Sequence, residues 1–159
     1  MVRAFIGVVL LLAASVGARA NEDPPAPLPQ APTGAGAPGL VSAEGHYQQG
    51  LVLARQQHWS AAETAHREAL RLRPAFPEAW NGLGFALRQQ GRYADSVRAY
   101  QEALRLRPDY PQALEYLGEA YVRLGRLDDA KAILTRLQPL DPEEARELAQ
   151  AIERAASGR

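Results

Sequence analysis

The sequence of 159 residues lacks cysteine and has one methionine and a single lysine, Lys131. The absence of cysteine excludes disulfide frameworks, thiolate zinc sites, iron–sulfur clusters and cysteine nucleophiles. An excess of one charge is also missing, because 18 basic side chains balance 18 acidic ones. Neutralising phosphates requires a basic excess, so general nucleic-acid binding is not expected.

Aromatic residues are scarce, with two Trp, six Tyr and three Phe, whereas alanine and leucine make up nearly a third of the chain. Alanine and leucine favour helices, and β-branched and aromatic residues favour strands. The composition therefore predicts a helical protein. Its length fits one modest domain with extensions.

The N-terminus has the pattern of a secretory signal peptide. Arg3 precedes an uncharged apolar run over residues 4–16, and Ala18-Arg19-Ala20 forms an A-x-A cleavage signal. We expect residues 1–20 to be a signal peptide cleaved after Ala20, which predicts a periplasmic or secreted protein. The alternative is an uncleaved anchor, although the run is shorter than the about 20 residues that cross a bilayer comfortably. Only that alternative predicts membrane attachment.

Residues 21–40 contain six of the twelve prolines, and alanine and glycine fill most of the rest. Such a segment buries too little apolar surface to offset its ordering entropy, so we expect a disordered linker. Within it, residues 34–39 match the G-x-G-x-x-G pattern of dinucleotide sites. That pattern functions only between a strand and a helix, and Pro38 removes a backbone donor. No cofactor is therefore expected.

From residue 43 the chain repeats every 34 residues. Residues 68–74 recur as 102–108 with seven identities, and the same offset relates Pro77 to Pro111, Leu83-Gly84 to Leu117-Gly118, and Gly91-Arg92 to Gly125-Arg126. Glycines and small residues at fixed places permit close helix crossing, and prolines end the second helix of each pair. A 34-residue period predicts stacked helix–turn–helix units.

These residues resemble the tetratricopeptide repeat (TPR) family, whose pattern places Trp, Leu-Gly and Tyr on the first helix, small residues on the second and a closing proline. The first unit, 43–76, matches this pattern at Gly50, Leu53, Ala62, Ala69 and Pro74. The second unit, 77–110, matches at Trp80, Leu83, Gly84, Leu87, Ser96, Tyr100, Ala103 and Pro108. The third unit, 111–144, matches at Leu114, Leu117, Gly118, Tyr121, Ala130, Leu134, Leu137 and Pro142. The first unit departs at His46 and Gln49. The resemblance implies an all-α fold, an α-solenoid of three TPR helix-turn-helix repeats.

A capping helix over residues 143–157 is predicted to follow the repeats. Asp141 is its expected N-cap, and Leu148 and Ile152 lie one turn apart where both can cover the last repeat. Pro139 has no counterpart in the earlier repeats and should shorten the second helix of the third repeat.

Catalytic and metal-binding patterns are missing from the sequence. It has no P-loop, no G-x-S-x-G, no H-E-x-x-H and no calcium loop. The three histidines, His46, His58 and His66, all fall in the first repeat, and a metal site there would need a further ligand. We therefore expect no metal site and no enzyme.

The resemblance implies that the first helices line a concave groove. Residues spaced by 34 there vary between the repeats, unlike the packing residues. The predicted peptide-binding residues are Tyr47, Leu51, Arg55, Asn81, Phe85, Arg88, Gln89, Glu115, Tyr116, Glu119 and Arg123. We expect exposed aromatic and leucine side chains at Tyr47, Leu51, Phe85 and Tyr116, beside arginines that can bind carboxylates. Ordinary solvated surface is the alternative.

The carboxylate clamp known from this family needs a ladder of Lys and Asn. At those places this chain has Tyr47, Leu51, Gly82, Gln112 and Tyr116. The sequence thus predicts a non-catalytic protein–protein interaction module, an exported adaptor or scaffold, that binds a peptide segment of a protein partner. The alternative is a self-associating or structural subunit of a cell-envelope complex, a possible homo-oligomer.

Overall fold

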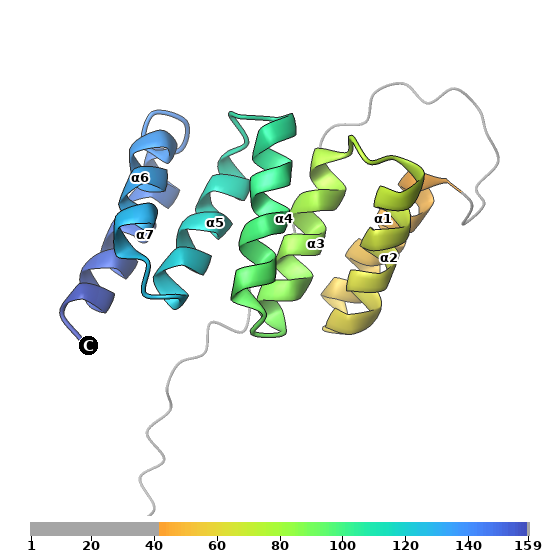
Figure 1. Cartoon of the computed structure of the whole chain (residues 1–159), viewed down its shortest axis with the longest axis horizontal. Coiled ribbons are helices and arrows are strands. Elements are labelled where there is room, and N and C mark those ends of the chain that lie inside the picture. The colour runs from red at the N-terminus through yellow and green to blue at the C-terminus, as the bar shows by residue number, and fades with distance from the viewer. Residues whose placement is uncertain (1–41, 159) are drawn as a thin grey trace, which may run out of the picture.

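The computed structural model describes residues 42–158, which form seven helices and no strand: α1 (Ala43–Arg55), α2 (Trp59–Leu72), α3 (Pro77–Gln89), α4 (Tyr93–Leu106), α5 (Pro111–Arg123), α6 (Leu127–Leu137) and α7 (Pro142–Ala156). Consecutive pairs stand side by side in a single row (Figure 1). This arrangement confirms the predicted all-α solenoid. The predicted signal peptide (1–20) and linker (21–40) lie outside the described residues. Within residues 42–158, every helix is too short or too polar to span a bilayer.

The helix starts follow the 34-residue period. The first helices start at Ala43, Pro77 and Pro111 and the second helices at Trp59, Tyr93 and Leu127. In α3 and α5 the first residue is proline. Proline suits this position because the backbone N–H that it lacks would have no partner inside the helix.

The turns inside the repeats need a left-handed residue before the second helix. Gly91 and Gly125 supply it at φ 75° and 70°, and Gln57 takes the same place in the first repeat at φ 60°. Glycine adopts this conformation without strain, whereas a residue with a side chain is disfavoured there. The first turn is therefore the strained one of the three.

Glycines allow the paired helices to approach closely. A methyl group added at Gly50 would lie 2.5 Å from the His66 ring, and one added at Gly84 would lie 2.6 Å from the Tyr100 ring. The third glycine differs, because the side chain facing Gly118 is Leu148 of α7, 2.5 Å from the added position. The capping helix thus occupies the space that a ring of the second helix fills in the other two repeats.

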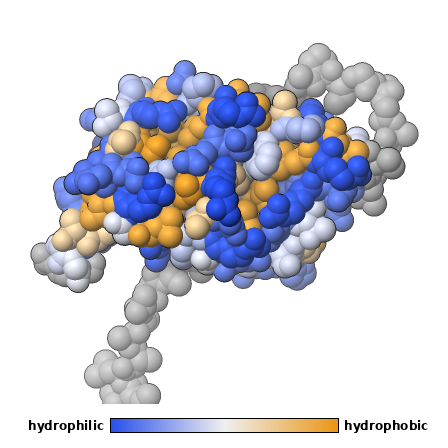
Figure 2. Space-filling model, in the orientation of Figure 1, coloured by the Kyte–Doolittle hydropathy of each residue, from blue (hydrophilic) through white to orange (hydrophobic). Residues whose placement is uncertain are grey.

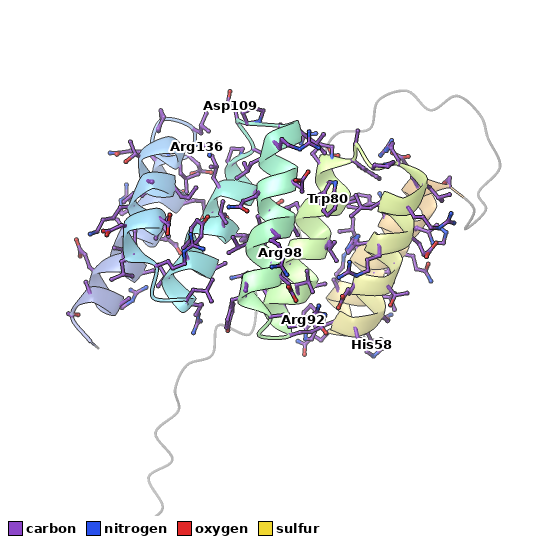
Figure 3. The ribbon with its side chains drawn as sticks, viewed as in Figure 1. His58, Trp80, Arg92, Arg98, Asp109 and Arg136 are labelled. Atoms are coloured by element: carbon purple, nitrogen blue, oxygen red, sulfur yellow. The ribbon has the colours of Figure 1, made fainter. Side chains whose placement is uncertain are left out.

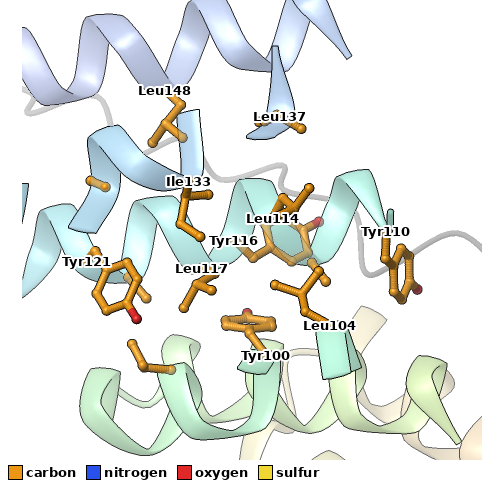
Figure 4. Packing of buried hydrophobic residues seen from close by; sticks show 14 of the residues in the cluster. Tyr100, Leu104, Tyr110, Leu114, Tyr116, Leu117, Tyr121, Ile133, Leu137 and Leu148 are labelled. Carbon is orange, nitrogen blue, oxygen red and sulfur yellow. The ribbon is translucent and has the colours of Figure 1, made fainter. Parts of the chain in front are cut away.

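The end of the array has the predicted features. The 11-residue α6 is shorter than the 14-residue α2 and α4, and Pro139 lies just beyond it. The Asp141 carboxylate accepts hydrogen bonds from the backbone N–H groups of Glu143 and Glu144, both at 3.2 Å. Leu148 and Ile152 are buried, and Figure 4 shows Leu148 reaching toward the third repeat. The predicted cap and covering residues are confirmed.

Helix contacts define the two faces of the array. The first helices touch along the row, α1 with α3 and α3 with α5, and α7 continues it by contacting α5. Among the described residues, α2 makes no such contact with α4, nor α4 with α6. The row of α1, α3, α5 and α7 is therefore the narrower, concave face.

Candidate functional site

The residues predicted to bind a peptide all lie on α1, α3 and α5, the helices of the concave face. Tyr47, Asn81 and Glu115 occupy the same place in successive repeats, one on each helix. We call these three residues the inner column. It crosses all three repeats, and Tyr47 and Asn81 are buried whereas Glu115 is half-buried.

The predicted exposure of four apolar side chains is wrong. Leu51 and Phe85 are at most 1% exposed, and Tyr47 and Tyr116 are 4% and 5% exposed. Phe85 is held between rings of its two neighbouring repeats, with centroids 5.8 Å from Trp59 and 5.6 Å from Tyr116. These positions vary along the sequence because each fits a different neighbour, and they belong to the core.

The charged and amide residues of the prediction also differ in accessibility. Arg88 is 9% exposed, forms an ion pair with Glu119 and lies 4.8 Å from the Tyr116 ring. It is therefore not the exposed carboxylate-binding arginine that was predicted. Arg55 and Arg123 are exposed as expected, and Gln89 is half-buried.

Two oxygen atoms of the inner column are buried without a hydrogen-bond partner, the Tyr47 hydroxyl and Oδ1 of Asn81. Burial, with a smaller effect of the Glu78 carboxylate, raises the pKa of Tyr47 to about 12, so the hydroxyl keeps its proton. The Asn81 Nδ2 donates to Oε1 of Gln112 at 3.2 Å. Unsatisfied buried polar groups are rare, and each requires a physical explanation.

The third residue of the column, Glu115, forms a carboxyl pair with Glu144 of α7. Burial raises the pKa of Glu115 well above its usual value, and the neighbouring carboxylates of Glu144 and Glu119 raise it further. The pKa of Glu144 is raised as well, first by burial and then by Glu147 and Asp141. Two adjacent carboxylates cannot both ionise cheaply, so the pair holds a proton near neutral pH.

A cavity of about 450 Å³ opens beside this pair, between α5 and α7. We call it the α5–α7 cavity. Its lining consists of Arg107, Asp109, Tyr110, Pro111, Gln112, Glu115, Asp141 and Glu144. Only Glu115 was predicted from sequence as a site residue. The other members come from the end of α4 and the turn after it, from the first two residues of α5 and from the start of α7.

The joints between repeats are built from a recurring trio that the sequence analysis missed. Arg73 donates to Glu44 at 2.9 Å and lies over the Phe76 ring at 3.4 Å. One repeat later, Arg107 pairs with Glu78 and lies 4.7 Å over the Tyr110 ring. The 34-residue spacing of all three members could have identified this trio in the sequence. These cations are used in stacking and pairing within the fold.

A second depression lies on the opposite face, between α2 and α4. It measures about 630 Å³ and has Trp80, Leu83 and Leu87 of α3 at its floor. Arg92 and Arg98 lie along it (Figure 3), and both are paired with Asp95. Figure 2 shows apolar patches on the visible face divided by hydrophilic side chains. This depression is therefore lined by charges that already have partners.

In the part of the chain that the structure describes, no three His, Cys, Asp or Glu residues form a group that could hold a metal ion. His66 is 1% exposed, and burial lowers its pKa to about 4. Its ring packs between the backbones of α1 and α3 at Gly50 and Gly82. His66 is therefore a neutral core residue.

Comparisons with known proteins agree with this architecture. A model described as TPR repeat matches residues 86–125, and models described as Tetratricopeptide repeat match residues 47–96 and 112–144. No curated protein sequence matches the chain.

Among solved structures, the first TPR of Spaghetti (RPAP3) bound to HSP90 peptide SRMEEVD is 21% identical, with a TM-score of 0.69 over 73% of this chain and 94% of that one. The TPR2B domain of yeast Sti1 in its pHsp70 complex is 19% identical, with a TM-score of 0.68 over 74% and 98%. The Arabidopsis OM64 TPR domain is 17% identical, with a TM-score of 0.68 over 72% and 97%. At these identities the likeness shows the fold alone.

Proposed function

Because the chain is a tetratricopeptide repeat protein, we propose that it is a non-catalytic module that binds an extended peptide segment of a partner protein. The segment lies along the inner column of α1, α3 and α5. The observation that carries this proposal is the pair of buried, unpartnered oxygens at matching places in successive repeats, on Tyr47 and Asn81.

An extended peptide offers what these atoms lack. Each of its residues carries one N–H donor and one C=O acceptor. The Tyr47 hydroxyl can donate to a carbonyl, and Oδ1 of Asn81 can accept from an N–H. Leaving a buried polar atom unsatisfied costs about 1–3 kcal/mol, which a ligand that bonds to it recovers.

Binding requires the atoms to be uncovered. Gln112 is half-buried and holds Asn81 through one hydrogen bond of 3.2 Å. Rotation of this long side chain exchanges that bond for bonds to the ligand. The Spaghetti domain is bound to the HSP90 peptide SRMEEVD and the Sti1 domain is in a pHsp70 complex, so the same fold binds protein ligands in other proteins.

A displayed library of random 12-residue peptides tests the proposal. The double variant Tyr47→Phe/Asn81→Leu removes both unpartnered oxygens with nearly isosteric apolar groups. Because burial without a partner is unfavourable, we expect this variant to be as stable as the wild type or more so. It should nevertheless lose the peptides that the wild-type protein enriches.

Tyr93→Phe removes the same hydroxyl group at the start of α4 and serves as the matched control. It should retain the enriched peptides. If the double variant folds, by circular dichroism, and still binds the same peptides, the inner column is not the binding site. Failure of the wild-type protein to enrich any peptide overturns the proposal as a whole.

We further propose that the module acts outside the cytoplasm, as the signal-peptide pattern of residues 1–20 favours. N-terminal sequencing of the protein from its native source should begin at Asn21. A protein that begins at Met1 and remains with the membrane fraction would instead support an anchor.

Self-assembly is the competing account. The large apolar side chains that are exposed among the described residues, Val52, Leu72, Leu124 and Leu140, are spread over four different places in the fold. A stable interface between copies normally needs a contiguous apolar patch. Sedimentation velocity should therefore give the mass of a monomer at all concentrations, and a mass that rises with concentration would favour the assembly subunit.

A further inference from the structure

The inner column begins beside the point where the chain enters the array. Ser42, the N-cap of α1, is exposed and has an extended backbone, with φ −104° and ψ 153°. The next residue, Ala43, packs against the cluster that contains Tyr47 and Phe76. Because a helix rises about 1.5 Å per residue, Tyr47 lies about 8 Å along α1 from Ser42. The segment that precedes Ser42 therefore joins the array at one end of the inner column.

Residues 33–41 have the composition and the length of a tether to this column. Three of them are glycines, Gly34, Gly36 and Gly39, and none is charged. A Gly-rich chain of nine residues has a root-mean-square end-to-end distance of about 17 Å. Packed helices are about 10 Å apart, so the column extends about 20 Å from α1 to α5. A tether whose length matches the span that it bridges gives the highest effective concentration, on the order of 1 mM.

Residues 24–32 can form the hydrogen bonds that the inner column lacks. They read Pro-Pro-Ala-Pro-Leu-Pro-Gln-Ala-Pro and carry no charged side chain. Their five prolines favour the polyproline II conformation, which is extended and has no internal hydrogen bonds. The Tyr47 hydroxyl, which has no partner, can donate to a carbonyl of this segment. The unpartnered Oδ1 of Asn81 can accept from a backbone N–H of a residue between the prolines.

The charges on the two sides are complementary. Two acidic residues, Glu22 and Asp23, come directly before residues 24–32, and no basic residue separates them from α1. Arg55 and Arg123 lie exposed in the last turns of α1 and α5. Within residues 42–158 neither arginine forms an ion pair. A segment that crosses the column therefore brings its acidic end toward cations that can pair with it.

We propose that residues 24–32 of the chain itself dock on the inner column in an extended conformation, tethered by residues 33–41, and compete there with the partner segment. This inference rests on the proposed mode of peptide binding and adds its regulation. At an effective concentration of about 1 mM, a segment with a dissociation constant of about 0.1 mM occupies the column in about nine of ten molecules. The apparent dissociation constant of the partner then rises about tenfold.

A spin label on the segment tests the docking, and the absence of cysteine from the chain lets one introduced thiol carry it. The full chain is labelled with a nitroxide at Ala31→Cys. We expect the NMR signals of the Tyr47 and Asn81 backbone amides to broaden more than that of Arg98, which is exposed on the opposite face (Figure 3). A segment that does not dock passes over both faces alike, so equal broadening overturns the proposal.

Two variants identify the atoms that hold the segment. Tyr47→Phe/Asn81→Leu removes both unpartnered oxygens and should abolish the difference between the two faces, whereas Tyr93→Phe should retain it. A difference that survives in Tyr47→Phe/Asn81→Leu overturns docking on the inner column. Labelled protein is also mixed with unlabelled, isotope-enriched protein. Broadening in this mixture means that a second copy supplies the segment, which overturns the contact within one chain.

Peptide affinity measures the competition. Pro25→Gly/Pro27→Gly/Pro29→Gly removes the rings that preorganise the segment, so its docking should weaken. A peptide enriched by the library selection should bind this variant about tenfold more tightly than the wild type. Ala35→Gly/Ala37→Gly makes the same kind of change in the tether and should bind the peptide as the wild type does. Equal affinities of the wild type and the proline variant overturn the competition.

The two measurements separate this inference from the proposed function. Library peptides that bind the wild type, with equal broadening of both faces by the label, support peptide binding and overturn the docking. Broadening confined to the inner column, with no peptide enriched by the wild type or by the proline variant, supports the docking and overturns binding of a partner. Equal broadening together with no enriched peptide overturns both.

Discussion

Lowering the pH from 7 to 4 should destabilise the protein through one side chain, His66. This residue is 1% exposed, its Nδ1 has no partner, and its ring lies between Gly50 and Gly82 with no room for a counter-charge on either side. Burial lowers its pKa from 6.5 to about 4. His66 therefore binds a proton near pH 6.5 in the unfolded chain, whereas in the folded chain it binds one only near pH 4.

The magnitude follows from this difference. Each pKa unit corresponds to about 1.4 kcal/mol, so the gap costs the fold about 3 kcal/mol at pH 4. The contribution of neutral His66 is fully present above pH 6.5 and is lost as the pH falls from there toward 4. A loss of this size is large for a domain, since typical free energies of unfolding are about 5–15 kcal/mol.

Urea denaturation followed by circular dichroism at pH 7, 6, 5 and 4 measures the effect. Carboxyl groups also titrate in this range, so the wild type is compared with His66→Phe, which keeps a planar ring between the glycines but has no proton to bind. Between pH 7 and 4 the wild type should lose about 3 kcal/mol more than the variant.

His58→Gln, a change at an exposed histidine, controls for the loss of a histidine as such. Parallel pH profiles for the wild type and His66→Phe would refute the reasoning. So would an NMR titration of the His66 ring with a midpoint near 6.5, because the ring would then not be held neutral by burial.

Three further changes test other features of the fold. Gln57→Gly should raise the free energy of unfolding by about 0.5–1 kcal/mol by relieving the positive φ of the first turn, and thermal melts in which Gln57→Ala gains as much would contradict this explanation. Asp141→Ala removes the N-cap of α7 and should lower stability in urea by about 1 kcal/mol, whereas equal losses for Asp141→Ala and Asp141→Asn would argue against capping. Because the folded protein raises the pKa of Glu115, stability should fall as the pH rises from 5 to 9, and Glu115→Gln should flatten this fall; an unchanged slope would show that the carboxyl pair is not strained.

The repeat architecture could be predicted because each of its determinants is local. The glycine of the turn, the proline at the start of α3 and α5 and the small residues at the helix crossing act within one 34-residue unit. The same holds for Asp141, which caps a helix that begins one residue later. Contacts between residues that are close in sequence recur every 34 residues, so the repeat of the sequence reveals them.

The exposure of the predicted binding residues could not be predicted as well, because the exposure of side chains on the first helices depends on how the repeats stack. Phe85 varies along its column and therefore resembled a ligand contact, yet it lies between Trp59 of the previous repeat and Tyr116 of the next. Variation between repeats marks either a ligand or a different packing neighbour. Only the positions of the neighbouring rings distinguish these two cases.

By itself the sequence determined the helical class, the three repeats with their cap and the absence of recognisable catalytic motifs, since these follow from composition, period and local capping. The tertiary structure decided which groove residues are core, which polar atoms are left without partners, and that Glu115 meets Glu144. The physical reason is that burial and the pairing of charges depend on distances across the stacked helices. Residues 29 positions apart become neighbours there only once α7 packs against α5.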